Sequence, residues 1–211
     1  MDYCGRNGAG KSTIFRIILG IINPDKGTVE LNNKKITKSI TNKIGYVPEE
    51  GSLNLQYTVL EQCIYYGALK DLTEKESKDE LLKWLEKFDI VEYMNTKIKD
   101  LSKGNRQKIQ VIISLLHNPE LLILDEPFSG LDPLSVEELK NVILDLKKEN
   151  KIIILSSHRM DQVDKICDDI LIIDKGNEVL KGELKVIKQK YNDNISLEDI
   201  FIERVEEKEH E

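Results

Sequence analysis

Cysteine is scarce in this chain, and long hydrophobic runs are missing from it. Its three cysteines, Cys4, Cys63 and Cys167, lie far apart and form neither a CxxC pair nor a zinc pattern, which indicates free thiols in a reducing compartment. The longest apolar runs, such as 111–113 and 152–155, are far shorter than the roughly 18–20 residues that span a bilayer. No secretory signal peptide is recognisable. We therefore expect a cytoplasmic protein that reaches a membrane only through a partner.

An excess of positive charge is missing as well. The chain carries 31 lysine and arginine residues against 38 aspartate and glutamate residues, a net charge of −7. Because no long basic stretch is present either, we expect no nucleic-acid partner. Its 211 residues are enough for one domain with a sizeable core, and too few for two such domains.

A phosphate-binding loop stands near the start of the chain. Residues 5–13 read GRNGAGKST and match the pattern GxxxxGK(S/T) in full. Glycines let such a loop turn tightly, so that main-chain N–H groups face the phosphates at a helix N-terminus. Lys11 then reaches the outer phosphates, and the Ser12 hydroxyl is placed for Mg²⁺. A glycine-rich turn that matches by chance is the alternative. The expected nucleotide contacts are Gly5, Arg6, Asn7, Gly8, Ala9, Gly10, Lys11, Ser12 and Thr13.

Short apolar runs alternate with longer amphipathic segments in the rest of the chain. This pattern predicts an α/β fold with a mostly parallel sheet flanked by helices. The expected strands are 44–47, 121–124, 152–155 and 170–173, with lesser strands at 28–31 and 178–180. Residues 57–117 show helical spacing only. We therefore predict a single domain with an α/β core (1–56 and 118–190), an inserted helical subdomain (57–117) and a C-terminal tail (191–211).

Several helix starts are recognisable. Thr73 with Glu76, and Ser135 with Glu138, have the spacing of capping boxes. Residues 101–105 read LSKGN and lead into a helix expected at 106–116. A serine and a glycine at a helix start can bind an anion, although ordinary capping is the more frequent role of such a serine.

An apolar strand that ends in two acids offers catalytic groups. The run 121–124 is followed by Asp125 and Glu126, at the carboxyl edge where open α/β sheets bind ligands. Asp125 can hold Mg²⁺, and Glu126 can polarise a water molecule. Alone, this segment is equally well interpreted as a buried strand before a solvated acidic turn. Together with the phosphate loop, it indicates a nucleotide site.

These motifs, in this order, resemble the ATP-binding subunit of an ABC transporter over nearly the whole chain. Residues 101–105 resemble the signature of that family, 129–132 (SGLD) resemble its D-loop, and His158 resembles its switch histidine. Taken alone, His158 would be an ordinary strand-end or helix-cap histidine. The resemblance implies a P-loop NTPase fold, ATP and Mg²⁺ as cofactors, and an ATPase that powers a membrane transporter.

The resemblance also implies roles for single residues. Lys11, Ser12 and Asp125 would hold the phosphates and Mg²⁺. Glu126 would act as general base on the attacking water, and His158 would contact the γ-phosphate. Catalysis of this kind works by positioning and charge stabilisation.

A head-to-tail dimer is implied as well. Each ATP would lie between the phosphate loop of one subunit and residues Ser102 and Gly104 of the other, and Asp132 would communicate between the two sites. A separate transmembrane permease would hold the dimer at the inner face of the cell membrane.

Three side chains depart from the family pattern. Glu49 stands where the family usually has glutamine, and its carboxylate can still bind Mg²⁺ while adding negative charge beside a polyphosphate. A solvated acidic turn is the alternative interpretation of Glu49. Lys103 replaces the first of the paired glycines of the signature, and Asn105 replaces its final glutamine. The stretches GYVPEEGSLN and SLEDIF resemble bacterial exporters of the sodium or drug-efflux type, so we expect an exporter.

The front of the chain departs furthest from the family. Family members carry a strand that leads into the phosphate loop and an aromatic residue that stacks on adenine. We recognise neither here, and Tyr3 is too close to the loop to be that aromatic residue. We therefore expect a truncated or mis-started product, or a fragment, that lacks a central strand and binds ATP weakly in isolation.

Two other functions stay open. A catalytically impaired remnant could still bind nucleotide and dock on a partner. A soluble ABC ATPase of DNA repair or translation is disfavoured, because the interval between Lys11 and Ser102 cannot hold the long coiled coil of repair ATPases. Translation ATPases usually have tandem nucleotide domains, which this chain is too short to contain.

Overall fold

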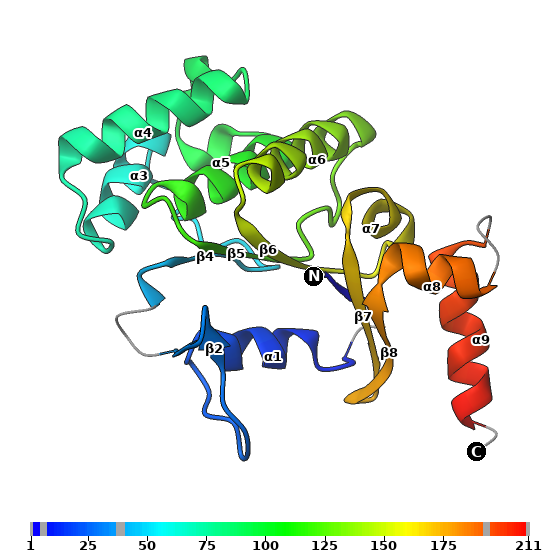
Figure 1. The fold of residues 1–211 in the computed structure, drawn as a ribbon. Coiled ribbons are helices and arrows are strands. Elements are labelled where there is room, and N and C mark those ends of the chain that lie inside the picture. The colour runs from blue at the N-terminus through cyan, green and yellow to red at the C-terminus, as the bar shows by residue number, and fades with distance from the viewer. Residues whose placement is uncertain (1, 5–7, 37–40, 192–194, 210–211) are drawn as a thin grey trace. The chain divides into compact units, whose positions relative to one another are not determined.

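The computed structural model describes residues 2–4, 8–36, 41–191 and 195–209 (Figure 1). By its internal contacts the chain divides into two compact units. One unit contains residues 1–36 and 153–211, and the other contains residues 37–152.

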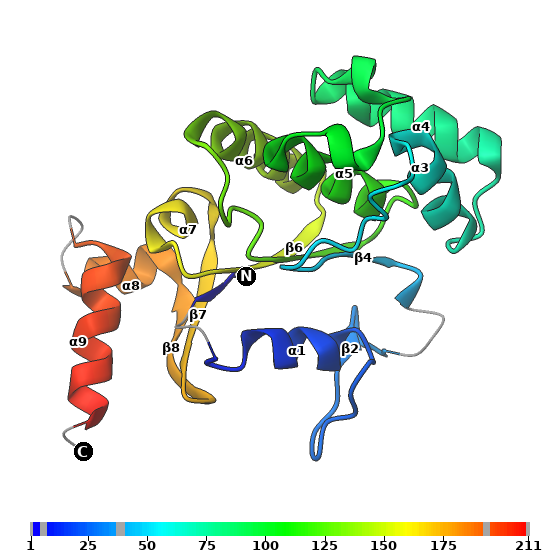
Figure 2. The same ribbon diagram turned by 180° about the vertical axis from the view of Figure 1, so that it is seen from behind.

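The unit of residues 1–36 and 153–211 contains strands in the order β6-β1-β7-β8. Strand β1 (Asp2–Cys4) pairs in parallel with both β6 (Ile152–Ser157) and β7 (Asp169–Asp174). Strand β8 (Asn177–Glu183) pairs antiparallel with β7, and the two strands lie side by side in Figure 2. The sheet is therefore mostly parallel within this unit, with one antiparallel strand added at β7.

Strand β1 corrects one expectation from the sequence. We expected the central strand that leads into the phosphate loop to be missing, but Asp2–Cys4 form it, with Tyr3 level with Ser156 and Leu171. Three residues are too few to show a hydrophobic period. The pairing itself uses backbone N–H and C=O groups, which nearly every residue offers.

The described residues of the same unit also form a short hairpin and four helices. The hairpin joins β2 (Glu30–Leu31) to β3 (Lys34–Lys35). Both turn residues, Asn32 and Asn33, have positive φ angles of 51° and 61°, as the tight turns of two-residue hairpins require. The helices are α1 (Lys11–Ile18), α7 (Met160–Ile166), α8 (Leu184–Tyr191) and α9 (Leu197–Glu209).

The unit of residues 37–152 combines two strands with a group of helices. Strands β4 (Ile44–Val47) and β5 (Leu121–Asp125) are parallel, and every residue of β5 is buried. Helices α3 and α4 lie beside α5 in both views (Figures 1 and 2). The helices are α3 (Val59–Ala68), α4 (Glu74–Lys87), α5 (Lys103–Leu115) and α6 (Pro133–Lys148), with 3-10 turns η1 (Val91–Tyr93) and η2 (Ile98–Asp100).

The predicted strands and helical stretch are confirmed. Five of the six predicted strands have the expected positions within two or three residues, and 28–31 is reduced to Glu30–Leu31. In residues 57–117, all of which the structure describes, only helices and one isolated bridge between Thr58 and Lys97 occur. Apolar periodicity located most of these elements because they bury one side or all of their surface, although β8 has no fully buried residue.

Helix capping was predicted less completely. The box of Thr73 and Glu76 is confirmed, and a second box, Thr58 with Glu61, escaped the sequence analysis. The predicted box at Ser135 is wrong, because Asp132 is the N-cap of α6 and accepts a hydrogen bond from the Ser135 amide. Pro133 at the first helical position favours this start, since its fixed φ suits a helix and its missing N–H costs nothing there.

Candidate nucleotide-binding site

The phosphate loop turns directly into α1. Gly8 and Gly10 have positive φ angles of 81° and 106°, and Gly10 is the N-cap of the helix. Glycine adopts such angles without strain, so the loop can bend there. Among the described residues of the first turn none is acidic, and the partial positive charge of the helix N-terminus is therefore left to attract an anion. Gly5, Arg6 and Asn7 lie outside the described residues.

The remaining loop residues surround the start of α1. Ala9 and Lys11 are buried, Ser12 is half-buried and Thr13 is exposed. The Ala9 carbonyl accepts a hydrogen bond of 3.1 Å from the amide of Gly176, in the turn between β7 and β8. The Lys11 ammonium adds positive charge at a helix N-terminus, which itself attracts anions. The described part of the loop thus fits a phosphate.

The two acids that follow β5 are both buried. Asp125 is the last residue of the strand and is 3% exposed, and Glu126 is 6% exposed. Glu126 has a φ of 49°, an uncommon value for a residue with a side chain. The Ser129 amide donates a hydrogen bond to the Glu126 carbonyl and closes the turn. The carboxylate oxygens of these two residues are ligands of the kind that Mg²⁺ takes.

Glu49 follows β4 at the same edge of the sheet as Asp125. Val47 is level with Leu124 in the parallel pair β4–β5, so the chain continues from both strands in one direction. The Glu49 side chain is exposed. This arrangement permits contact with a ligand above the strand ends, and it is equally the environment of a solvated acidic turn.

His158 lies in the other unit, directly after β6. Its side chain is exposed, and the amide of the next residue, Arg159, donates to the Ser157 hydroxyl over 3.0 Å. The structure therefore places His158 in a turn at the carboxyl end of a parallel strand, as the sequence predicted.

The signature segment, residues 101–105, begins α5. Ser102 is exposed and caps the helix by accepting a hydrogen bond of 3.1 Å from the Asn105 amide, and Gly104 is buried in the first turn. The helix thus starts at Lys103, three residues before the predicted start. Ordinary capping and a role in anion binding are both compatible with this geometry, because capping uses only one of the lone pairs of the Ser102 hydroxyl.

The D-loop, residues 129–132, ends at the N-cap of α6. Asp132 is exposed, and its carboxylate accepts hydrogen bonds from the Ser135 amide (3.0 Å) and the Ser135 hydroxyl (2.6 Å). The Ser135 hydroxyl, followed by the amide, lowers the pKa of Asp132. Asp132 is therefore a fixed, charged carboxylate at the surface.

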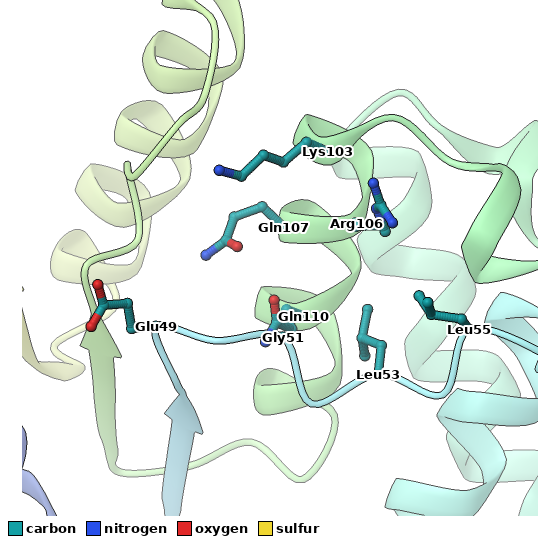
Figure 3. A pocket seen from close by; sticks show the side chains of 8 residues that line it. All are labelled: Glu49, Gly51, Leu53, Leu55, Lys103, Arg106, Gln107 and Gln110. Atoms are coloured by element: carbon teal, nitrogen blue, oxygen red, sulfur yellow. The ribbon is translucent and has the colours of Figure 1, made fainter.

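A pocket of about 370 Å³ lies beside the signature segment (Figure 3). Its wall combines the loop after β4 with one face of α5, and Lys103 and Gln107 extend from α5 toward the side where Glu49 lies. Among the polar residues of its wall, sequence analysis did not single out Arg106, Gln107 and Gln110. The signal was present, since these polar residues recur at helical spacing with Lys103 in a helix that is otherwise largely apolar.

The predicted site residues are distributed over the two units. Gly8–Thr13 and His158 belong to the unit of residues 1–36 and 153–211. The unit of residues 37–152 contains Glu49, Ser102, Gly104, Asp125, Glu126 and Asp132. Among the described residues no group of three or more histidine, cysteine, aspartate or glutamate side chains could hold a metal ion. Mg²⁺ bound mainly through substrate phosphates needs only one or two protein oxygens.

Comparisons with known proteins identify the family of the chain. The family described as ABC transporter matches residues 3–129. An ABC transporter ATP-binding protein of Alkalihalophilus pseudofirmus is 49% identical over 187 residues, which are 89% of this chain and 70% of the relative. The ABC transporter ATP-binding protein YhaQ of Bacillus subtilis is 48% identical over 187 residues, 89% of this chain and 63% of the relative.

A third relative has a more specific name. The linearmycin resistance ATP-binding protein LnrL of Bacillus subtilis is 35% identical over 181 residues, 84% of this chain and 58% of the relative. The chain thus spans about 58–70% of the length of these relatives. In the part of the chain that the structure describes, no helix is both long and apolar enough to cross a membrane.

A solved structure confirms the predicted fold. An ATP-binding subunit of an ABC transporter superposes with a TM-score of 0.86 at 29% identity, over 97% of this chain and 88% of the other. The expected α/β P-loop NTPase fold is therefore correct. The chain belongs to the family of ABC transporter ATP-binding proteins, the P-loop ATPases that bind ATP with Mg²⁺ and couple its hydrolysis to transport.

Proposed function

We propose that this chain hydrolyses ATP to power a membrane exporter. The observation that carries the proposal is the pair of buried carboxylates, Asp125 and Glu126, at the end of β5. A remnant without catalysis would gain nothing from keeping two buried acids and a left-handed glutamate, since burying carboxylates and holding a glutamate at positive φ both cost stability. The name of LnrL, which refers to resistance to linearmycin, supports export as the direction.

Each site residue has a proposed role. Lys11 and Ser12 bind the phosphates and Mg²⁺, together with Asp125. Glu126 is the general base for the attacking water, and His158 contacts the γ-phosphate. The burial of Lys11, Asp125 and Glu126 supports this assignment, because a low local dielectric strengthens charge stabilisation during phosphoryl transfer. Glu49 and the loop residues 5–13 complete the nucleotide contacts.

The proposed assembly is a head-to-tail dimer on a separate transmembrane permease. In it, Ser102 and Gly104 face the nucleotide of the second subunit, and Asp132 connects the two sites. The exposure of Ser102 and Asp132 supports these roles, since both must meet another chain. The permease then keeps the dimer at the inner face of the cell membrane. We also propose one nucleotide-binding domain, with core 1–56 and 118–190, helical subdomain 57–117 and tail 191–211.

The decisive experiment measures phosphate release by the purified chain with ATP and Mg²⁺. We expect hydrolysis that stops when Mg²⁺ is chelated, and a loss of about 10²–10³-fold in the Glu126→Gln variant, as for removal of a general base. Glu92→Gln removes an exposed carboxylate in η1 and serves as the matched control, with unchanged hydrolysis. Equal rates for the wild type and Glu126→Gln would contradict the proposal, and so would a wild type without Mg²⁺-dependent hydrolysis.

A further inference from the structure

The first turns of α5 and α6 touch at Gly104. A Cβ atom added to Gly104 would lie 2.5 Å from the Ser135 Oγ and 3.3 Å from the Ser135 Cβ. The first of these distances is a steric clash in a packed interior. Gly104 therefore lacks a side chain at a position where α6 leaves no room for one.

Ser135 also holds the carboxylate of the D-loop. Its amide donates to Asp132 Oδ1 over 3.0 Å, and its hydroxyl donates to Oδ2 over 2.6 Å. Hydrogen bonds to a charged acceptor are the stronger kind, and two of them fix the plane of the carboxylate. Ser135 thus contacts the signature segment on one side and Asp132 on the other.

An ion pair joins the same two helices farther along. Lys108 Nζ lies 2.7 Å from Glu138 Oε2, with the Lys108 side chain only 9% exposed. Lys108 is four residues after Gly104, and Glu138 is three residues after Ser135, so these residues share the contacting faces of α5 and α6. The Lys103 side chain, at the start of α5, also lies close to Gly130 of the D-loop, where an added Cβ atom would meet its Nζ. The start of α5 thus approaches both α6 and the D-loop.

We propose that Ser135 is a positioning residue, which holds the Asp132 carboxylate against Gly104 so that the signature segment and the D-loop move as one body. The inference rests on the proposed function, in which both segments meet the second subunit. It gives Gly104 a role beyond close approach to a phosphate. A shift of the signature segment on nucleotide binding carries Asp132 with it through Ser135.

The first test is a double-mutant cycle of Ser135→Ala and Asp132→Ala in the full chain, read as ATP hydrolysis. Ser135→Ala keeps the Cβ and the amide hydrogen bond and removes only the hydroxyl bond. We expect kcat to fall about tenfold, the typical effect of one hydrogen bond to a charged group, with KM changed less than about twofold. In the Asp132→Ala background the same change has no further effect, because the carboxylate is gone. Independent, multiplying losses would overturn the inference, as would full activity of Ser135→Ala.

The second test asks why position 104 is glycine. Gly104→Ala places a methyl group against the Ser135 hydroxyl and is expected to lower kcat by more than about tenfold. Adding Ser135→Ala removes the closest atom and leaves a contact of 3.3 Å, so the double variant recovers to the level of Ser135→Ala. A double variant as impaired as Gly104→Ala would show that Gly104 serves the phosphate alone. Asn141→Ala, an exposed change on α6, is the matched control, and circular dichroism verifies folding.

A readout without hydrolysis separates this inference from the proposed function. Carbon-13 labelled aspartate reports the titration of Asp132 by nuclear magnetic resonance. Ser135→Ala is expected to raise the pKa of Asp132 toward its ordinary value, and Gly104→Ala is expected to do so as well, by displacing Ser135. If Glu126→Gln shows no loss of hydrolysis, the proposed function fails while this titration still decides the inference. An unchanged Asp132 titration in both variants would overturn it.

Discussion

Glu126 combines a buried side chain with a left-handed backbone. Its φ of 49° and its exposure of 6% are each unfavourable for a glutamate, and strain of this kind is typical of functional sites. The neighbouring Asp125 ends a regular strand and carries no such strain. At position 126, the proposed catalytic role requires a buried glutamate with a left-handed backbone, whereas the stability of the fold disfavours both features.

Replacing Glu126 with glycine tests whether this residue lowers the stability of the protein. Glu126→Gly relieves the backbone and removes a buried carboxylate, so we expect the protein to be stabilised by about 1 kcal/mol and the melting temperature to rise by roughly 2–4 °C. ATP hydrolysis is lost in the same variant. Differential scanning calorimetry of the wild type, Glu126→Gly and Glu126→Gln makes the comparison. A lower melting temperature for the glycine variant than for the wild type would show that the backbone is not strained.

His117 is a second residue whose environment sets its chemistry. Its Nε2 lies 3.1 Å from the Ile44 carbonyl oxygen, which can only accept, so Nε2 carries the proton. Burial, followed by the nearby Lys70 ammonium, lowers the pKa of His117 to about 4. The folded protein therefore favours the neutral ring.

The stability of the protein should depend on pH through this histidine. In the unfolded chain His117 takes up a proton near pH 6.5, and in the folded protein it does so only near pH 4. Its stabilising contribution is thus complete above pH 6.5 and is lost as the pH falls toward 4. Between pH 7 and pH 5 we expect a loss on the order of 1 kcal/mol, reduced for partial exposure.

Urea unfolding of the wild type and His117→Gln at both pH values measures this loss. The glutamine Nε2 can keep the hydrogen bond to Ile44 and does not titrate, so its midpoint is expected to change less between the two pH values. Equal changes in the two proteins would exclude His117 as the source.

At the scale of elements, periodicity and capping residues explain most of the fold. The strands and helices with strong apolar patterns were predictable because burial imposes a period on the sequence. Strand β1 and hairpin strand β3 were not, because three and two residues are too short for a period. The start of α6 was misjudged because two residues, Asp132 and Ser135, could each act as its cap. Pro133 favours Asp132, and this frees Glu138 to pair with Lys108.

The Lys108–Glu138 pair gives a prediction for the contact of α5 with α6. Glu138→Ala leaves the buried ammonium of Lys108 without its partner and should destabilise the protein by roughly 3 kcal/mol. Lys108→Met removes the buried charge itself and fills a similar volume, so its cost should be less than half as large. Denaturant unfolding of both variants tests the order, and a Lys108→Met variant less stable than Glu138→Ala would contradict it.

At the scale of the whole molecule, the proposed dimer should depend on ATP and on the signature segment. In size-exclusion chromatography with light scattering, the Glu126→Gln variant with ATP and Mg²⁺ is expected to have twice the monomer mass of 24.3 kDa. The dimer persists in this variant because the bound ATP is not hydrolysed. Adding Ser102→Arg places a bulky cation at the exposed start of α5 and should keep the protein monomeric. Asn141→Arg on α6 is the matched control and should still allow the dimer. Dimers in the Ser102→Arg variant would exclude this segment from the interface.

The sequence by itself determined the family, the fold class and the cofactors. It could do so because phosphate and Mg²⁺ recognition uses short contiguous segments, such as 8–13 and 121–126. The order of residue types within each segment is enough to identify its chemistry. Only the tertiary structure decided the place of β1, the face of α5 that lines the pocket, and the contacts of Ser135 with Gly104 and Asp132. These features depend on contacts between residues that are far apart in the sequence, or on hydrogen bonds between backbone groups. Neither kind of interaction produces a recognisable pattern of side chains along the chain.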